Sequence, residues 1–591
     1  MIGSRSAFSQ MLFHAAGIIV ALLLHASALR AQVPAPNDKT TAAIISGRVI
    51  TKDGAPISDA RVAVTRMGAE RVSQTRPHVE GNGTFRTDAL EPGLYFVSAG
   101  AAGYVSDPLQ GSSTYYHPGD SVTLTLVKGG VITGVVKDSN GEPLIATLVR
   151  ATRVRDQEGR VIQLPAGSRD RLTDDRGVYR LYGLTPGSYV VSAGGPGGAG
   201  RDGPPTAFEK DSPTYAPSST RDTAVEVTLN SVDELTVDIQ YRGEPGHAIS
   251  GRVTGTIKYE GQSLGSAAIS LIDARSRTEI GSTTSLSYNR FAFAFFGVPD
   301  GEYELYASQT GPTGELMSPP QRVKVQGADV TELLLAVSAL ATIDGRVIIE
   351  SDPKAPCGKR PSSALLETMM FARRYEPERK TSTSAKDPVR VDVPLRFQSL
   401  SNQAFVDARG TFTVRNLPAG AYRIEPREPA SGWYVRSITL DPVAKNPNLP
   451  RDGLTLTSGE HTSGLSVTIT EGAAKLSGHI STSERQSLSP LVRVYLAPAE
   501  RDAAENILRF YEARTEANGS FAFDDIAPGK YWIVMRPAEL NDQASTKSVR
   551  QDATLRAKIV QEAGALKKAL TLKPCEEVSD FSLPYVAPVS P

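Results

Sequence analysis

The chain has 591 residues, and its 64 basic and 64 acidic side chains give a formal net charge of zero. Such a length predicts several domains, and 52 glycines with 40 prolines are typical of many short strands joined by turns. The neutral balance excludes a whole-molecule field that would attract nucleic acid or an anionic membrane.

The first 31 residues have the order of a secretory signal peptide. Arg5 precedes an apolar run from Ala15 to Leu24, and small residues follow at Ala28 and Ala31. The run is too short for a settled transmembrane helix, and polar sequence with prolines comes after it. We therefore expect cleavage near Ala28 or Ala31. The mature protein is expected to be secreted, periplasmic or on the cell surface, with no transmembrane segment after signal removal.

After the predicted signal, an apolar strand centred on glycine opens each of five similar copies. Alternating apolar residues predict that one face of this strand points inward. The five glycines are Gly47, Gly134, Gly251, Gly345 and Gly478.

Later in four of the copies, an acidic residue stands three positions before a turn glycine. Its carboxylate can accept backbone N–H groups across the turn, so we assign it to the fold and not to catalysis. The third copy has Phe291 in place of the turn glycine, so its hairpin tip is expected to differ. The acidic residues are Glu80, Asp174, Asp407 and Glu516.

An aromatic residue and a tyrosine ten positions later complete the pattern, with a proline-glycine type of turn between them. A spacing fixed in five copies marks one repeated structural unit, in this case a hairpin whose tyrosine faces inward. The pairs are Phe85 and Tyr95, Tyr179 and Tyr189, Phe293 and Tyr303, Phe412 and Tyr422, and Phe521 and Tyr531.

These opening strands, acidic turns and tyrosine hairpins resemble the carboxypeptidase regulatory-like domain, a small transthyretin-like β-sandwich of bacterial envelope proteins. The resemblance covers most of residues 42–545 and implies an all-β fold, a tandem array of five Ig/transthyretin-like β-sandwich domains with a short C-terminal helix. In metallocarboxypeptidases such a domain accompanies a catalytic one, which is not evident in this sequence. The expected domains are 1–31 (signal peptide), 42–128, 129–242, 247–338, 341–470 with an insertion, and 473–586 with the helix.

The role of the insertion, residues 354–400 in the fourth copy, stays open. The only two cysteines are Cys357 and Cys575. In an oxidising compartment an even pair is expected to form a disulfide, which would tie the fourth copy to the C-terminal tail. Two unrelated buried thiols are the alternative.

Near the C-terminus, apolar residues recur at helical spacing and predict one amphipathic helix packed on the last sandwich. They are Leu555, Ile559, Ala563, Leu566 and Leu570.

Signals for catalysis are weak. The run from Gly261 to Gly265 has the spacing of a nucleophile elbow around Ser263, but a strand is expected after it where the elbow needs a helix, so an ordinary turn is preferred. The histidines are scattered and do not form the cluster that a zinc carboxypeptidase requires. The sequence therefore predicts no enzyme, no metal site and no cofactor.

Exposed aromatic rings would be the best sign of recognition, because they stack on sugars or fill partner pockets. Packing between domains is the alternative for each ring. The candidate ligand-binding aromatics are Tyr115, Tyr116, Trp433, Tyr434 and Trp532.

Together these features predict an exported, non-enzymatic β-sandwich array that acts as a structural or adhesive, protein-binding component of the cell envelope. Its expected partner is an envelope protein or polysaccharide, and nucleic acid is not expected. A carbohydrate-binding accessory protein and a hydrolase with an unrecognised site are the alternatives.

Overall fold

The computed structural model describes residues 44–584 with internal gaps. The predicted signal peptide, Ser263 and Cys357 lie outside the described residues. The gaps are 69–72, 107–114, 158, 160, 163–168, 197–207, 257–264, 277, 312–313, 352–364, 376–401, 428–431, 442–448, 482–491, 517, 538–547 and 567–568.

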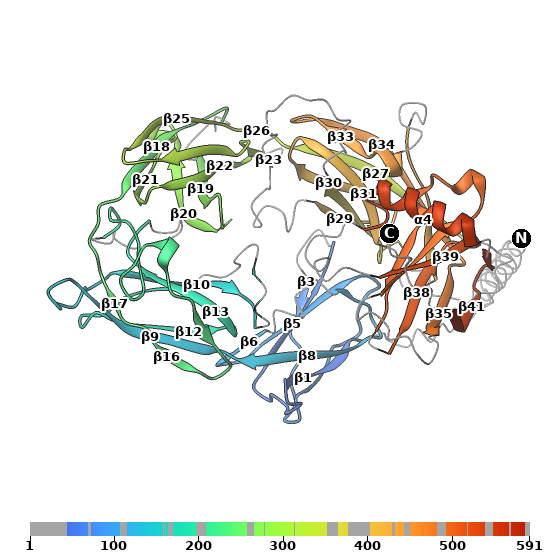
Figure 1. Cartoon of the computed structure of the whole chain (residues 1–591), viewed down its shortest axis with the longest axis horizontal. Helices are drawn as coiled ribbons and strands as arrows, with labels where there is room; N and C mark the ends of the chain where they lie inside the picture. The colour runs from blue at the N-terminus through green and yellow to red at the C-terminus, as the bar shows by residue number, and fades with distance from the viewer. Residues whose placement is uncertain are drawn as a thin grey trace, which may run out of the picture.

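The described chain forms five consecutive β-sandwiches, each made of two sheets (Figure 1). This confirms the predicted all-β fold with a C-terminal helix. We name the sandwiches 1 to 5 in chain order, by the strands that they span: 46–128, 130–240, 247–339, 341–471 and 474–584.

The first sheet of every sandwich is built around its opening strand. In sandwich 1, β1 (Ser46–Thr51) pairs antiparallel with β4 (Thr84–Arg86) and parallel with β8 (Ser121–Lys128). The other sandwiches repeat this order of opening, turn and closing strand. The equivalent triplets are β9 (Gly130–Lys137), β12 (Val178–Leu184) and β16 (Glu234–Thr236); β18 (His247–Thr254), β21 (Ala292–Val298) and β25 (Val330–Ala336); β27 (Ala341–Glu350), β30 (Thr411–Leu417) and β34 (His461–Glu471); and β35 (Ala474–Ser481), β38 (Ser520–Ile526) and β41 (Glu577–Pro584).

The second sheet carries the repeat tyrosine. In sandwich 1 its order is β3 (Ser73–Thr75), β2 (Arg61–Arg66), β5 (Tyr95–Gly100) and β7 (Tyr115–Tyr116). The predicted ten-residue hairpin is therefore wrong: β4 pairs with β1 in the first sheet and β5 pairs with β2 and β7 in the second, so the turn between Phe85 and Tyr95 crosses from one sheet to the other. The equivalent sets are β11 (Arg169–Leu172), β10 (Leu148–Arg155), β13 (Gly187–Ala193) and β15 (Val227–Leu229); β20 (Glu279–Leu286), β19 (Ser266–Asp273), β22 (Gly301–Gly311) and β24 (Gln321–Val325); β29 (Gln403–Phe405), β28 (Met369–Arg374), β31 (Gly420–Arg427) and β33 (Leu454–Leu456); and β37 (Tyr511–Arg514), β36 (Val492–Pro498), β39 (Gly529–Pro537) and β40 (Ala569–Leu572).

Additional strands and helices extend single sandwiches. The strands are β6 (Tyr104–Ser106), β14 (Thr214–Tyr215), β17 (Ile239–Gln240), β23 (Gly314–Met317), β26 (Ser338–Ala339) and β32 (Trp433–Leu440). The α-helices are α3 (Leu449–Asp452) and α4 (Ala553–Leu566), and the 3-10 turns are η2 (Arg221–Thr223), η3 (Ser287–Asn289), η5 (Arg501–Ala503) and η6 (Ile507–Arg509).

The glycine of the opening strand is required by the closing strand beside it. A Cβ atom at Gly47 would lie 2.0 Å from the carbonyl oxygen of Val122, and one at Gly134 would lie 2.0 Å from that of Val237. Real Cβ atoms do not approach a backbone oxygen so closely. The parallel closing strand can therefore reach the opening strand only where the side chain is a hydrogen atom.

Each repeat tyrosine is buried, and its hydroxyl donates a hydrogen bond to the carbonyl oxygen four residues earlier. The ring fills the core while the hydroxyl satisfies a turn carbonyl, as in the tyrosine corner of other sandwiches. Burial raises the pKa of Tyr422 to about 12. The bonds are Tyr95 to Glu91 (2.9 Å), Tyr189 to Thr185 (2.6 Å), Tyr303 to Pro299 (2.7 Å), Tyr422 to Pro418 (2.7 Å) and Tyr531 to Ala527 (2.6 Å).

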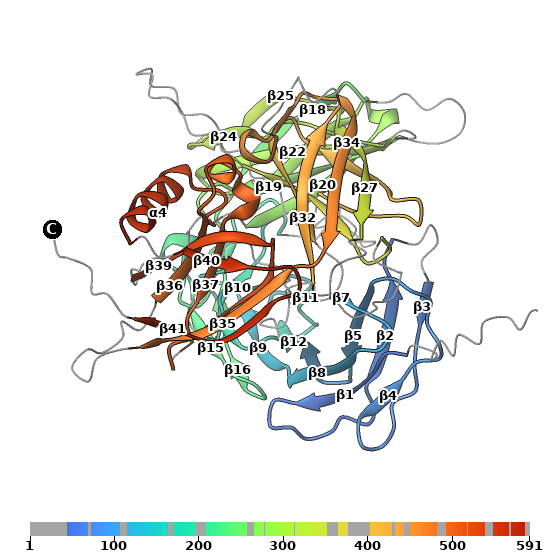
Figure 2. The same cartoon turned by 90° about the vertical axis from the view of Figure 1, so that its right-hand side faces the viewer.

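Helix α4 covers the outer face of the second sheet of sandwich 5 (Figure 2). Ile559 and Ala563 are fully buried there, and Trp532 packs against the same cluster. The predicted helix extended to Leu570, but that residue lies in β40, which pairs with β39 and completes the sheet. The helix therefore ends earlier than the apolar spacing predicted, because the last residue of the pattern pairs in a strand.

Candidate functional site

Sandwich 1 contacts sandwich 4, although they are far apart in sequence; they lie beside each other in both whole-chain views (Figures 1 and 2). The contact has its own hydrophobic cluster, separate from the cores of the two sandwiches. Leu94, Tyr115 and Met369 are buried in this cluster, and three half-buried side chains pack against them: Met67, Phe371 and Phe405.

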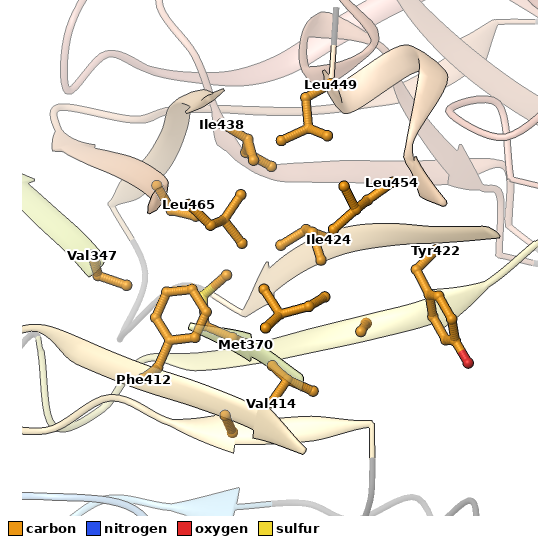
Figure 3. Close-up of a cluster of buried hydrophobic side chains, with 14 of the residues drawn as sticks. Val347, Met370, Phe412, Val414, Tyr422, Ile424, Ile438, Leu449, Leu454 and Leu465 are labelled. Atoms are coloured by element: carbon orange, nitrogen blue, oxygen red, sulfur yellow. The ribbon is translucent and has the colours of Figure 1, made fainter. Parts of the chain in front are cut away.

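Strand β28 supplies sandwich 4's part of the contact because its side chains alternate between two faces. Met370 and Ala372 belong to the core of sandwich 4, where Figure 3 shows Met370 among the other core side chains. Met369 and Phe371 point to the opposite face, toward sandwich 1. One strand therefore serves both an internal core and a surface contact.

Tyr115 lies at the centre of the aromatic part of the contact. Its ring meets that of Phe405 edge to face, with centroids 6.0 Å apart, and the guanidinium of Arg427 lies 5.5 Å from its centroid. Such geometry adds cation–π and quadrupole attraction to the burial of apolar area. Because Tyr115 is 7% exposed, this candidate ring is occupied by packing between domains.

A polar group borders the aromatic cluster. The two ring nitrogens of His117 lie 3.5 Å from a carboxylate oxygen of Asp120, in its own turn, and 3.7 Å from one of Glu367, in sandwich 4. The hydrogen bond to Asp120 is the largest cause that holds the pKa of His117 above its usual value. Burial and the charge of Arg427 act in the opposite direction.

At the junction of sandwiches 2 and 3, one position of the repeat carries a different residue from the other sandwiches. On the neighbouring strand of the second sheet, an arginine is paired with the repeat tyrosine in sandwiches 1, 2 and 4, where the pairs are Arg66 with Tyr95, Arg153 with Tyr189 and Arg374 with Tyr422. In sandwich 3, Asp273 occupies this position opposite Tyr303. Arg221 of sandwich 2 reaches across and pairs with Asp273 at 2.5 Å. The replaced arginine is thus supplied by the neighbouring domain.

The other candidate aromatics are also covered. Trp433 is buried in the core of sandwich 4, and Tyr434 beside it is half-buried. Trp532 packs beneath α4, and Tyr116 packs against the core of sandwich 1. Trp433, Tyr116 and Trp532 thus pack within their own sandwiches, whereas the expected alternative was packing between domains.

Chemistry-bearing residues are dispersed. Among the residues that the structure describes, no three histidine, cysteine or acidic side chains are grouped closely enough to hold a metal ion. Cys575 is disulfide-bonded, whereas Cys357 lies outside the described residues. In the described part of the chain, no helix is long and apolar enough to cross a membrane.

Exposed apolar side chains on sandwich 2 were not among the candidates from sequence. Tyr182 is 59% exposed, Ile145 55% and Leu172 45%, and Arg171 places its guanidinium 5.4 Å from the centroid of the Tyr182 ring. The signal for Tyr182 was present in the alternation of β12, because Tyr179 and Leu181 point inward. We call Tyr182 and Arg171 the sandwich 2 patch.

Comparison with known proteins gives one sequence match. Residues 44–126 match the carboxypeptidase regulatory-like domain family. A search of curated proteins gives no match.

Solved structures with similar local geometry include surface proteins of low identity. The Bacillus anthracis TIE protein is 12% identical over 50% of this chain and 51% of that chain, with a TM-score of 0.14. The minor pilin GBS52 of Streptococcus agalactiae is 12% identical over 37% and 99% of the two chains, with a TM-score of 0.19. The shaft pilin SpaA of Lactobacillus rhamnosus GG is 11% identical over 34% and 96%, with a TM-score of 0.16. The chain thus spans about half the length of the TIE protein, and these TM-scores carry no argument about the whole arrangement.

Proposed function

We propose that this chain, whose residues 44–126 form a carboxypeptidase regulatory-like domain, is an exported, non-enzymatic β-sandwich array that serves as a structural, protein-binding component of the cell envelope. What supports the proposal is that the repeated polar residues are occupied by the fold. The five tyrosine hydroxyls satisfy turn carbonyls.

The repeated aspartates serve the fold in the same way, whereas beside Glu80 and Glu516 the side chains of Asn82 and Asn518 accept the backbone N–H of Thr84 and Ser520. Asp174 accepts the backbone N–H of Val178 at 2.8 Å, and Asp407 accepts that of Thr411 at 2.8 Å. The bond from Val178 is the largest cause that holds the pKa of Asp174 below its usual value. Burial raises the pKa of the Asp407 carboxyl, but hydrogen bonds from the side chain and the backbone of Thr411 lower it more, so that it also lies below its usual value. What the chain repeats is therefore a scaffold, and its function is expected to depend on surfaces and not on a repeated reactive site.

The sandwich 2 patch is the surface that we assign to protein binding. Tyrosine and arginine are enriched among the residues that dominate the binding energy of protein contacts, and here an exposed tyrosine lies beside an arginine. A photo-crosslinking amino acid at Tyr182, introduced into the full chain in intact cells, tests this assignment. We expect light-dependent adducts to a defined envelope protein.

The same crosslinker at Lys52, an exposed turn position of sandwich 1, is the matched control. The proposal requires that position 52 does not give the adduct seen from position 182. Adducts that are equal at both positions, or absent from both, would contradict a binding role for this patch.

Export is the second part of the proposal and has a simple test. The N-terminus of the protein recovered from the envelope or the medium should begin after Ala28 or Ala31, as the signal pattern predicts. A full-length chain retained in the cytoplasm would contradict it.

No specific observation supports the carbohydrate-binding or the hydrolase alternative. A carbohydrate site would need accessible ring faces, and Trp433 is buried while Trp532 packs beneath α4. Ser263, the residue on which the hydrolase alternative depends, lies outside the described residues. Covalent labelling of Ser263 by a serine-hydrolase probe would revive that alternative.

A further inference from the structure

We propose that sandwich 1 is docked on sandwich 4 as a reversible latch, which opens without unfolding either sandwich and then exposes an apolar strip on sandwich 4. The strip consists of Met369, Phe371 and Phe405. It is distinct from the sandwich 2 patch and adds a conformational change to the proposed structural role.

The first reason is that the latch and the two cores use different side chains. The core of sandwich 4 contains Met370, Ala372 and Ala404, which alternate along β28 and β29 with the residues of the strip. Separation of the two sandwiches therefore leaves the core of sandwich 4 in place. Local opening of this kind costs less than global unfolding, because it exposes only the contact surface.

The second reason is the composition of the contact. Its polar members are the 3.7 Å approach of His117 to Glu367 and the cation–π contact of Arg427 with Tyr115. Partly exposed pairs of this type contribute little to stability, and contacts between domains of one chain usually resemble transient protein interfaces. The apolar cluster favours the closed form, but six side chains do not make it permanent.

The third reason is a junction that can act as a hinge. Sandwiches 3 and 4 are joined by exposed side-chain hydrogen bonds, from Ser458 to Ser338 (2.8 Å) and to the carbonyl of Ala339 (2.9 Å), and by one partly buried bond in which the backbone N–H of Glu315 donates to Asn416 Oδ1 (3.3 Å). Bonds that water can replace resist rotation weakly. The junction of sandwiches 2 and 3 differs, because it contains the less exposed pair of Arg221 and Asp273. We assign the hinge to the short stretch between β26 and β27.

Two adjacent methionines provide an internal test. Met369 and Met370 are both fully buried, but Met369 is covered by sandwich 1, whereas Met370 is covered by the core of sandwich 4. Hydrogen peroxide converts an accessible methionine to its sulfoxide. In the native full chain, mass spectrometry with fragment ions should show faster oxidation at Met369 than at Met370.

The variant Phe405→Ala removes one side chain of the strip without removing a core residue. We expect about a tenfold increase in the oxidation rate of Met369, which corresponds to a change of about 1.4 kcal/mol in the opening equilibrium, and an unchanged rate at Met370. Ile348→Ala is the matched control, because Ile348 is an exposed residue of β27 outside the contact. It should leave both rates unchanged.

Two results would overturn the latch. One is equal oxidation of the two methionines in the wild-type chain, which would mean that Met369 becomes accessible only on unfolding of sandwich 4. The other is a Met369 rate that Phe405→Ala does not change, which would mean that the oxidant reaches Met369 without separation of the sandwiches. Small-angle scattering gives an independent readout, since the Phe405→Ala chain should have a larger radius of gyration than the Ile348→Ala chain.

Discussion

At the scale of the residue, the repeat tyrosine has two functions that phenylalanine could not combine. The ring of Tyr303 fills the core of sandwich 3, and its hydroxyl satisfies the carbonyl of Pro299 at 2.7 Å. A phenylalanine would leave that carbonyl without its partner, at a cost typical of an unsatisfied buried group. The sequence indicated an inward tyrosine, but only the structure shows why the hydroxyl is kept.

Tyr303→Phe should therefore lower the free energy of unfolding of sandwich 3 by about 1–2 kcal/mol. Hydrogen exchange of sandwich 3 peptides in denaturant measures this value within the full chain. Tyr288→Phe, in the same sandwich, is the control, because its side chain is 70% exposed and its loss of a hydroxyl should change stability by less than about 0.5 kcal/mol. Equal effects of the two variants would show that the hydroxyl of Tyr303 does not stabilise the turn.

Glycine in the opening strand leads to a second prediction at this scale. Gly47→Ala places a methyl group 2.0 Å from a carbonyl oxygen of β8 and should destabilise sandwich 1 by about 3 kcal/mol, since backbone must move to relieve the clash. Gly100→Ala, in the same sandwich, has no heavy atom within 4 Å of the new Cβ and should not destabilise it. Hydrogen exchange of sandwich 1 peptides at increasing denaturant concentration measures the free energy of unfolding in both variants. Similar losses of unfolding free energy in Gly47→Ala and Gly100→Ala would contradict the steric explanation.

At the scale of the element, the turn between β7 and β8 carries a charge pair. His117 and Asp120 close this turn, with the backbone N–H of His117 donating to the Asp120 carboxylate at 2.7 Å. The pKa of His117 is raised and that of Asp120 is lowered, each mainly by its hydrogen bond with the other. The pair therefore stabilises the fold most between the two pKa values.

The sign of the pH dependence follows from the raised pKa of His117. Its stabilising effect is fully present below the unfolded value of about 6.5 and is lost as the pH rises through the higher folded value. The unfolding midpoint of sandwich 1 should fall over this window, and His117→Gln should remove the slope. Glu367 and Arg427 also face His117, with opposite effects on its pKa. His78→Gln is the control, because His78 is exposed, and this variant should keep the pH dependence of the unfolding midpoint. Loss of the pH dependence in His78→Gln would contradict its assignment to His117.

Elements with local signals were predictable, and elements defined by pairing were less so. The opening strands and α4 follow from alternation and helical spacing, because those patterns reflect neighbours on the same element. Leu570 fits the helical spacing but lies in β40. β40 forms by hydrogen bonding to β39, which is distant in sequence, and a local apolar pattern does not reveal such pairing.

At the scale of the whole molecule, Cys575 lies in the turn before the closing strand of sandwich 5. The equivalent turn position is Gly119 in sandwich 1 (φ 108°), Val232 in sandwich 2 (φ 66°) and Gly459 in sandwich 4 (φ 70°), and Cys575 has φ of 59°. The positive φ of this turn is therefore shared by several sandwiches, with or without glycine. The structure has Cys575 in a disulfide, and we propose Cys357, the other cysteine of the chain, as its partner.

Non-reducing peptide mapping of the protein should recover a Cys357–Cys575 linked peptide. Closing so long a loop stabilises the folded state by about 5 kcal/mol in the chain-entropy model, so Cys357→Ser should lower the unfolding temperature measured by calorimetry. Reduction should have little further effect on that variant. Alkylation of two free thiols in the denatured, unreduced protein would contradict the pairing.

The sequence by itself determined the repeated sandwich, because alternation and the ten-residue interval from aromatic residue to tyrosine are short-range features that each copy carries independently. It did not determine that the strands on either side of this interval lie in different sheets. Only the tertiary structure decided which outward faces are covered. Met369 and Tyr182 are both outward-facing apolar residues, yet one is buried against sandwich 1 and the other is exposed. The physical reason is that a strand's outward position has the same local pattern whether water or a distant domain lies over it, so the contact of sandwiches 1 and 4 depends on how the whole chain is arranged.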